Sequence, residues 1–142
     1  MKLEDVIRSK GNEVVTISPD AAVGELVDLM SGKNIGAVVV SADGHHIDGI
    51  VSERDIVRAL AANGCDLQSA SVRDLMTAEV VTGAPTDPIE DTAHTMTKKR
   101  VRHIPILVNG ELSAIVSIGD VVKYRIDQLT DERNHLLGYL HT

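Results

Sequence analysis

The residues with the clearest potential for chemistry are a serine and an aspartate three positions apart, and this pair occurs twice. Ser52 and Asp55 form the first pair, and Ser117 and Asp120 form the second. Each pair follows an apolar Ile-Val dipeptide, so it lies where a strand is expected to pass into a helix. A helix N-terminus offers free N–H groups to a phosphate, and a nearby carboxylate can accept hydrogen bonds from both ribose hydroxyls. The pairs therefore predict two half-sites for a ribonucleotide.

The same two pairs also have a purely structural interpretation. A serine at the N-cap with an acidic residue three positions later is a capping box, which satisfies the first N–H groups of a helix and complements its dipole. Capping alone could account for either pair. The pairs are therefore consistent with a nucleotide half-site and with a capping box.

The chain around these pairs is duplicated. Val14-Val15-Thr16 returns as Val80-Val81-Thr82, and the matching positions continue through both serine–aspartate pairs. A unit this short cannot bury its apolar faces alone, so the copies should pack against each other about a pseudo-twofold axis and form paired clefts. We expect the first repeat to span residues 1–69 and the second to span residues 70–142.

Hydrophobic periodicity predicts the same order of elements in both repeats: a helical lead-in, then strand, helix, strand, strand and helix. The Asn109-Gly110 dipeptide between two apolar runs is typical of a hairpin turn. Residues 64–70 are expected to form a short polar linker. The expected segments are 2–7, 14–16, a helix around 23–30, 37–40, 47–51 and 53–63, then 71–76, 80–82, 89–99, 104–108, 112–116 and a final helix.

The final helix is expected to extend past the end of the repeat. Its apolar stripe comprises Val121, Val122, Ile126, Leu129, Leu136, Leu137 and Leu140. The stripe has two interpretations: the helix folds back on its own core, or the stripe is an oligomer contact, most simply in a twofold homodimer.

Composition restricts the class of protein. The 142 residues suffice for one domain with a hydrophobic core, and 14 Lys and Arg against 21 Asp and Glu give a net charge of −7. This charge opposes nucleic-acid binding, and the absence of Phe and Trp removes stacking platforms. Cys65 is the single cysteine, which favours a reducing compartment, and we expect a cytoplasmic location. No apolar run is long enough to predict a signal peptide or a membrane span.

Four motifs, in this order along both halves, resemble those of tandem cystathionine β-synthase (CBS) domain proteins, the regulatory units known as Bateman modules. The resemblance implies an α+β fold of two pseudo-symmetric βαββα repeats packed face to face, here with an extended C-terminal helix. It also implies a module that senses adenosine-containing ligands without transforming them. The motifs are Ile50-Val51-Ser52-Glu53-Arg54-Asp55, Asp74-Leu75-Met76-Thr77, Arg102-His103-Ile104-Pro105-Ile106 and Ile115-Val116-Ser117-Ile118-Gly119-Asp120.

The resemblance also assigns site residues. It places Asp55 and Asp120 at ribose, the two serines close to ribose or phosphate, and the basic start of the middle strand at phosphate. Because the first repeat has Gly36-Ala37 where the second has Arg102-His103, we expect the Asp120 site to be the stronger. That site comprises Lys10, Asn12, Ile35, Gly36, Arg102, His103, Ser117, Ile118, Gly119 and Asp120. The second site comprises Ser52, Arg54, Asp55, Thr77, Val80, Val81 and Val101.

Three functions are weighed. The first is a regulatory module that binds AMP, ADP, ATP or NAD(H), with AMP favoured, and signals through its oligomer or an unidentified protein partner. The alternative is a constitutive dimerisation or scaffold module with vestigial nucleotide sites. An enzyme is not expected, because the chain lacks a G-x-x-x-x-G-K loop and a metal-ligand cluster. His45-His46 has no third metal ligand at a recognised spacing, so no metal site is predicted.

Overall fold

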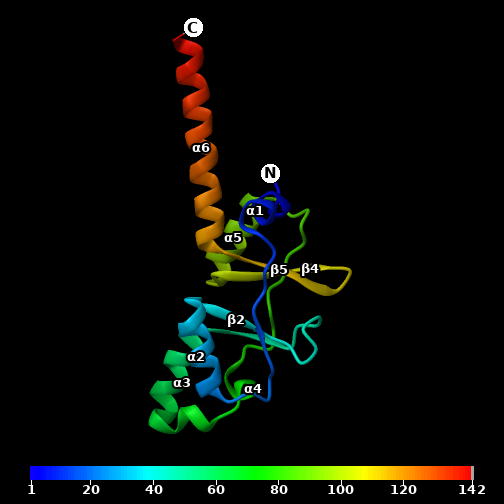
Figure 1. Ribbon diagram of the computed structural model, residues 1–142, viewed down its shortest axis with the longest axis vertical. Coiled ribbons are helices and arrows are strands. Elements are labelled where there is room, and N and C mark those ends of the chain that lie inside the picture. The colour runs from blue at the N-terminus through cyan, green and yellow to red at the C-terminus, as the bar shows by residue number, and fades with distance from the viewer. Residues whose placement is uncertain (142) are drawn as a thin grey trace.

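The computed structural model describes residues 1–141, and it consists of two stacked halves with one long helix projecting from the upper half (Figure 1). The elements are α1 (Leu3–Lys10), β1 (Thr16–Ile17), α2 (Val23–Lys33), β2 (Ala37–Val40), β3 (Gly49–Ser52), α3 (Glu53–Asn63), the 3-10 helix η1 (Gly64–Ser69), α4 (Val72–Leu75), α5 (Ile89–Lys99), β4 (His103–Val108), β5 (Glu111–Ser117) and α6 (Ile118–Leu140). The predicted α+β class is confirmed. The helices predicted at 53–63 and 89–99 have those bounds.

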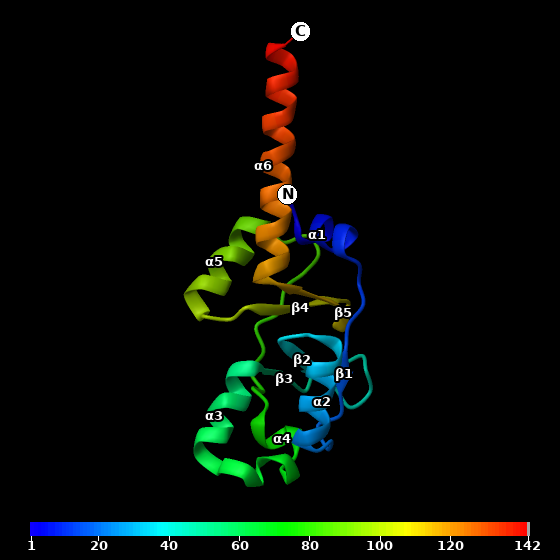
Figure 2. The same cartoon turned by 60° about the vertical axis from the view of Figure 1, so that its left-hand side comes forward.

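Each half contains one small sheet, and the two sheets meet at the waist of the molecule (Figure 2). In the first sheet β1 runs parallel to β2, and β2 pairs antiparallel with β3. The second sheet is the β4–β5 hairpin, whose turn residues Asn109 and Gly110 both have positive φ, as a two-residue hairpin turn requires. The predicted hairpin is therefore confirmed.

The strand predicted at 80–82 is wrong. In its place a single parallel bridge joins Gly83 to Ile106, at positions equivalent to the β1–β2 pair of Ile17 with Val40. The bridge keeps two hydrogen bonds to β4, one donated by the Gly83 N–H to the Pro105 carbonyl and one accepted by the Gly83 carbonyl from Leu107. The residues before Gly83 lie along a cleft between the halves and not along β4, which is why no strand forms there.

The two lead-in helices are exchanged between the halves. Leu3 and Val6 of α1 are buried in the core of the second half, whereas Val72 of α4 is buried in the core of the first. The backbone bonds obey the same pseudo-symmetry, because Glu4 donates to the Pro85 carbonyl and Arg73 donates to the Pro19 carbonyl, both at 2.9 Å. Each core therefore needs a helix from the other end of the chain. The repeat boundary between residues 69 and 70 stays a prediction about the sequence, and it does not separate the two packed cores.

Two segments differ from their sequence expectations. The segment expected as a polar linker forms η1, and its Leu67 is buried because it packs under α2 and α3. The long helix α6 does not fold back, since its C-terminal half leaves the body of the molecule (Figure 1). Within residues 1–141 no helix combines the length and the apolar character needed to cross a membrane.

Candidate functional site

The two serine–aspartate pairs begin α3 and α6, as the sequence predicts. The Asp120 carboxylate accepts the Ser117 backbone N–H at 2.9 Å, and the Ser117 hydroxyl accepts the Asp120 N–H at 3.1 Å. The Asp55 carboxylate accepts the Ser52 backbone N–H at 2.8 Å and the Ser52 hydroxyl at 3.1 Å. Both pairs therefore cap a helix. In each hydrogen bond of the Asp55 pair the acceptor is Oδ2, and Oδ1 accepts none within the described residues.

A cleft with a volume of 730 Å³ opens between the halves beside Asp55. Thr77 forms part of its wall because two backbone hydrogen bonds with Ile50 hold it against the edge of β3. All seven residues predicted for the second site line this cleft: Ser52, Arg54, Asp55, Thr77, Val80, Val81 and Val101. The structure therefore brings together residues that the sequence places on four separate segments.

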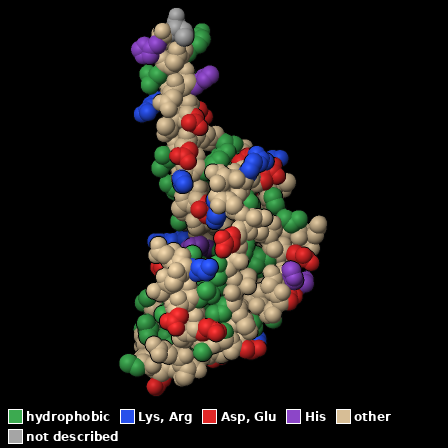
Figure 3. Space-filling view, in the orientation of Figure 1, with side chains coloured by type: hydrophobic (Ala, Val, Ile, Leu, Met, Phe, Trp, Pro, Cys, Tyr) green, Lys and Arg blue, Asp and Glu red, His purple; other side chains and the backbone are tan. Residues whose placement is uncertain are grey.

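Five cationic side chains line the same cleft, and none of them forms an ion pair or hydrogen bond within residues 1–141. They are Arg54 and Arg58 from α3, Lys99 and Arg100 from the end of α5, and Arg102 before β4. Three carboxylates, Glu53, Asp55 and Glu79, also line it. Basic side chains and a histidine gather at the waist on the face shown in Figure 3. In a chain of net charge −7, unpaired cations collected in one cleft favour an anionic occupant.

Three of these cations, Lys99, Arg100 and Arg102, lie at the junction between α5 and β4. Arg100 ends α5 in the left-handed conformation, with φ of 55°, whereas its counterpart at the end of α2 is Asn34, with φ of 54°. Asparagine tolerates this conformation better than other side chains with a Cβ, so the arginine costs backbone energy. Two further equivalent bonds fix the next turn: the Arg102 carbonyl accepts from Ile118, and the Gly36 carbonyl accepts from Glu53.

The other half-site is occupied by a side chain of the protein itself. Lys10 donates to Asp120 Oδ2 at 2.6 Å and to the Ile115 carbonyl at 2.7 Å. Burial alone would raise the pKa of Asp120, but the Lys10 and Ser117 hydrogen bonds and the Lys10 charge together hold that pKa below its usual value. Lys10 and Asp120, which the sequence assigns to one ligand site, therefore lie in direct contact as an ion pair.

His103 lies between the two half-sites. It lines the Asp55 cleft, and the charges that act on it are those of Asp120, Lys10, Glu53 and Arg102. Burial lowers the pKa of His103 below its usual value, more than the attraction of Asp120 raises it. The imidazole is therefore poised next to a cleft rich in cations.

The remaining residues of the predicted Asp120 site are divided between Asp120 and the Asp55 cleft. Ser117 caps the helix turn that carries Asp120, and His103 interacts with the Asp120 charge. Arg102, His103 and Gly36 line the Asp55 cleft, while Ile35 packs against the first core and Asn12 lies exposed before β1. Ile118 and Gly119 form the first turn of α6. The predicted ranking of the two sites depends on Arg102 and His103, and both residues line the Asp55 cleft. The ranking stays a prediction.

Three cations of the cleft, Arg58, Lys99 and Arg100, were missing from the sequence prediction. The sequence does contain a signal for Lys99 and Arg100, because together with Arg102 they form a cluster of three cations. The equivalent positions of the first repeat are Lys33, Asn34 and Gly36, with one cation. Arg58 carried no such signal. It faces the cleft only because α3 turns it there, one turn after Asp55.

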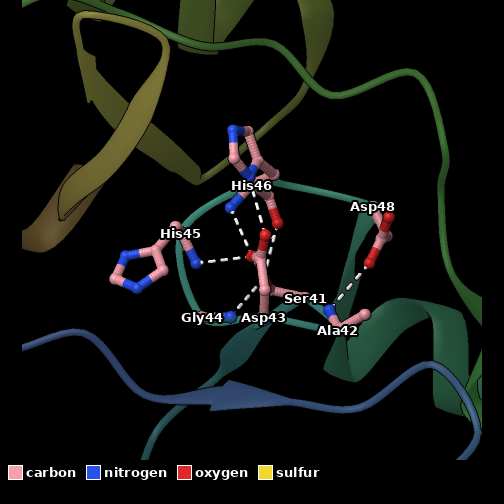
Figure 4. A network of polar contacts seen from close by, with 7 residues as sticks. All are labelled: Ser41, Ala42, Asp43, Gly44, His45, His46 and Asp48. Atoms are coloured by element: carbon pink, nitrogen blue, oxygen red, sulfur yellow. Dashed lines mark hydrogen bonds and ion pairs between the residues drawn. The ribbon is translucent and has the colours of Figure 1, made fainter.

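The turn that carries His45-His46 is organised by a carboxylate and not as a metal site. Asp43 accepts the backbone N–H groups of His45 and His46 at 2.7 and 2.8 Å, and its other oxygen lies 2.7 Å from His46 Nδ1 (Figure 4). The two imidazole rings point in different directions. These bonds, led by the His46 N–H, hold the pKa of Asp43 below its usual value. No metal-binding cluster occurs among residues 1–141.

The fold and the clefts define a two-repeat module, and comparison with known proteins identifies its family. The CBS domain family model matches residues 3–62 and 72–127, so the chain belongs to the CBS domain family. A mitochondrial CBS domain-containing protein of Arabidopsis thaliana is 32% identical over 97% of this chain and 71% of its own length. The crystal structure of a CBS-domain-containing protein from Agrobacterium tumefaciens is 41% identical, with a TM-score of 0.85, over 88% of this chain and 99% of that chain.

A more distant structure shares the fold. The CBS domain pair of protein MJ0100, solved in complex with 5′-methylthioadenosine and S-adenosylmethionine, is 20% identical to this chain with a TM-score of 0.78. It covers 90% of this chain and 98% of its own.

Proposed function

We propose that this chain is a regulatory module that binds an adenine nucleotide in the Asp55 cleft. The observation that carries the proposal is the group of five unpaired cations around a carboxylate with one free oxygen, all in one cleft of 730 Å³. Clefts of this volume are typical of small-molecule sites. Arginine is well suited to phosphate because its planar guanidinium donates two parallel hydrogen bonds.

The parts of a nucleotide match different parts of the cleft. Asp55 Oδ1, which no described residue occupies, is available to the ribose hydroxyls. Val80, Val81 and Val101 offer an apolar wall for adenine. The cations of α3 and of the α5–β4 junction line the same cleft and would bind phosphate.

The ligand class draws support from a structural neighbour. The MJ0100 domain pair binds two adenosine-containing ligands, and we transfer the adenosine part to this chain. The five cations that line the Asp55 cleft support the phosphate part of the ligand. We propose AMP, ADP, ATP or NAD(H) as ligands and expect affinity to rise with the number of phosphates. Catalysis is not part of the proposal, and we place the module in the cytoplasm, with binding signalled through an oligomer or a protein partner.

Thermal unfolding of the purified, ligand-stripped protein tests this proposal. AMP, ADP, ATP, NAD, NADH, S-adenosylmethionine and adenosine are each titrated against it, because a ligand that binds only the folded state stabilises it by about 2.7 kcal/mol at a concentration of 100 Kd. We expect a rise in Tm for the phosphorylated ligands that Asp55→Asn abolishes. Asp74→Asn is the matched control, because Asp74 caps α4 through a like pair with Ser71 and does not line the cleft. A flat response to every ligand would contradict the proposal.

The second candidate is a constitutive scaffold with vestigial sites, and one observation favours it. Lys10 holds the Asp120 carboxylate at 2.6 Å, in the place that a ribose would take. A ligand at that half-site has to displace an ion pair. The scaffold function predicts dimers whose affinity is the same with and without nucleotide, which analytical ultracentrifugation distinguishes from the regulatory function.

A further inference from the structure

The projecting helix α6 carries a row of apolar side chains with the spacing of a coiled coil. Two sets of residues make up this row, each with members seven positions apart, and together they are called the α6 seam: Val122, Leu129 and Leu136 in one set, and Ile126, Arg133 and Leu140 in the other. Alternating steps of three and four residues keep the seam on one side of the helix. Its five apolar members are between 47% and 76% exposed.

The α6 seam faces away from the core of its own chain. Val121 is buried and Tyr124 packs against the core of the second half, whereas Val122, next to Val121, is half exposed. Among residues 1–141 no other element lies beside α6 beyond its first turns (Figure 1). Hydrophobic side chains are visible along its projecting part (Figure 3). Within the described residues nothing covers the seam, so its burial requires another molecule.

We propose that the α6 seam pairs with the α6 seam of a second copy of this chain, and that the two helices run antiparallel. The orientation follows from Arg133, the single charge in the seam. A parallel pair would place the two Arg133 side chains against each other in an apolar layer, which is costly. An antiparallel pair centred on Asp131 places Arg133 of each copy opposite Leu129 of the other.

The same antiparallel register aligns every other layer of the seam. Val122 meets Leu140 of the second copy and Ile126 meets Leu136 of the second copy, so each layer joins one member of each set. The overlap from residue 122 to residue 140 is about 27 Å long at 1.5 Å per residue. The twofold axis makes the contact self-complementary and closed, as expected for a soluble dimer.

The charges next to the axis support this register. Glu132 precedes Arg133, and both lie within two residues of the centre of the overlap. Arg133 of one helix therefore comes within reach of Glu132 of the other, and symmetry makes two such ion pairs. The seam cation that opposes parallel pairing is thus matched by a carboxylate in the antiparallel dimer.

The oligomeric state of paired variants tests the surface. Leu129 and Leu60 are equally exposed leucines, at 47% and 48%, but Leu60 lies on α3. By sedimentation equilibrium we expect the wild type and Leu60→Lys to be dimers. Leu129→Lys places a second cation against Arg133 of the other copy, and we expect it to dissociate with an affinity weaker by on the order of 100-fold. Circular dichroism verifies the fold of each variant. A monomeric wild type, or a dimer that only Leu60→Lys disrupts, would overturn the proposal.

Disulfide cross-linking tests the orientation. In the Cys65→Ser background, chains carrying Val122→Cys and chains carrying Leu140→Cys are oxidised separately and as a mixture. The antiparallel register predicts a cross-link between the two variants and none within either variant alone. Cross-links within each variant alone would show parallel helices and would overturn the orientation. The test requires no nucleotide, so its outcome is independent of the function of the Asp55 cleft.

Discussion

Lys10 and Asp120 lie near opposite ends of the chain and form an ion pair with a distance of 2.6 Å between Nζ and Oδ2. The pair joins the last residue of α1 to the first turn of α6, and so fixes the exchanged lead-in helix to the second half. Asp55, the equivalent of Asp120, forms no ion pair among the described residues. The two halves therefore present one blocked carboxylate and one available carboxylate.

Lys10→Met should lower the free energy of unfolding at neutral pH. It should also reduce the part of that free energy that is lost in acid. The lowered pKa of Asp120 contributes stability above its usual value of 3.8, and this contribution is lost as the pH falls through the folded-state pKa. Lys10→Met should cost about 1 kcal/mol near neutral pH, a small amount because the ion pair is partly exposed. The cost should be less in acid, because protonation of Asp120 removes the ion pair in the wild type. Urea unfolding at pH 6 and pH 3 measures both values. An equal loss at the two pH values would show that Lys10 acts through packing alone.

Arg100→Asn should stabilise the protein and weaken ligand binding. Asparagine relieves the left-handed backbone of Arg100, as at its counterpart Asn34, and we expect the free energy of unfolding to rise by about 0.5 kcal/mol. The lost cation should weaken the binding of ATP more than that of adenosine. Isothermal titration calorimetry measures both affinities. Arg125→Gln, which removes one positive charge from α6 outside the cleft, is the control for net charge. Equal weakening of ATP by both variants would remove Arg100 from the phosphate site.

Gly49→Ala should be strongly destabilising. A Cβ at Gly49 would lie 2.7 Å from Met76 Sδ and 2.9 Å from the Thr77 carbonyl oxygen, so the segment that holds the cleft wall has to move. We expect a loss of about 1–3 kcal/mol, typical of overpacking. Gly32→Ala is the matched control, since nothing lies within 4 Å of its Cβ in α2 and alanine favours a helix by about 1 kcal/mol. Chemical denaturation should shift in opposite directions for the two variants, and a neutral Gly49→Ala would contradict the close contact.

The duplication in the sequence was sufficient to predict the repeat architecture, because local periodicity governs each helix. The bounds of α3 and α5 match because the apolar spacing and the C-terminal stop signals are local. The strand expected at 80–82 fails for a non-local reason: Val80 and Val81 are apolar because they line a cleft, and periodicity does not distinguish a cleft wall from a buried strand.

The sequence grouped seven residues of the Asp55 cleft together but assigned Gly36, Arg102 and His103, which line the same cleft, to the other site. Asp55, Thr77 and Val101 come from different segments, and their prediction as one site agrees with the cleft that they line. The assignment of Arg102 to the Asp120 site depended on which side of the waist the start of β4 faces, and sequence does not reveal this. The exchange of α1 and α4 was likewise hidden, since either core could accept either amphipathic helix.

His103 should couple nucleotide binding to pH. Burial lowers its pKa below 6.5, so the folded, unliganded protein resists protonation and loses stability as the pH falls below 6.5. A phosphate in the Asp55 cleft would stabilise the imidazolium, raise the pKa of His103 and draw a proton into the complex. Affinity for AMP should therefore rise more between pH 7.5 and pH 6 in the wild type than in His103→Gln, which retains only the titration of the ligand itself. NMR titration of His103 with and without AMP measures the shift directly, and an unchanged pKa on saturation would place the phosphate away from His103.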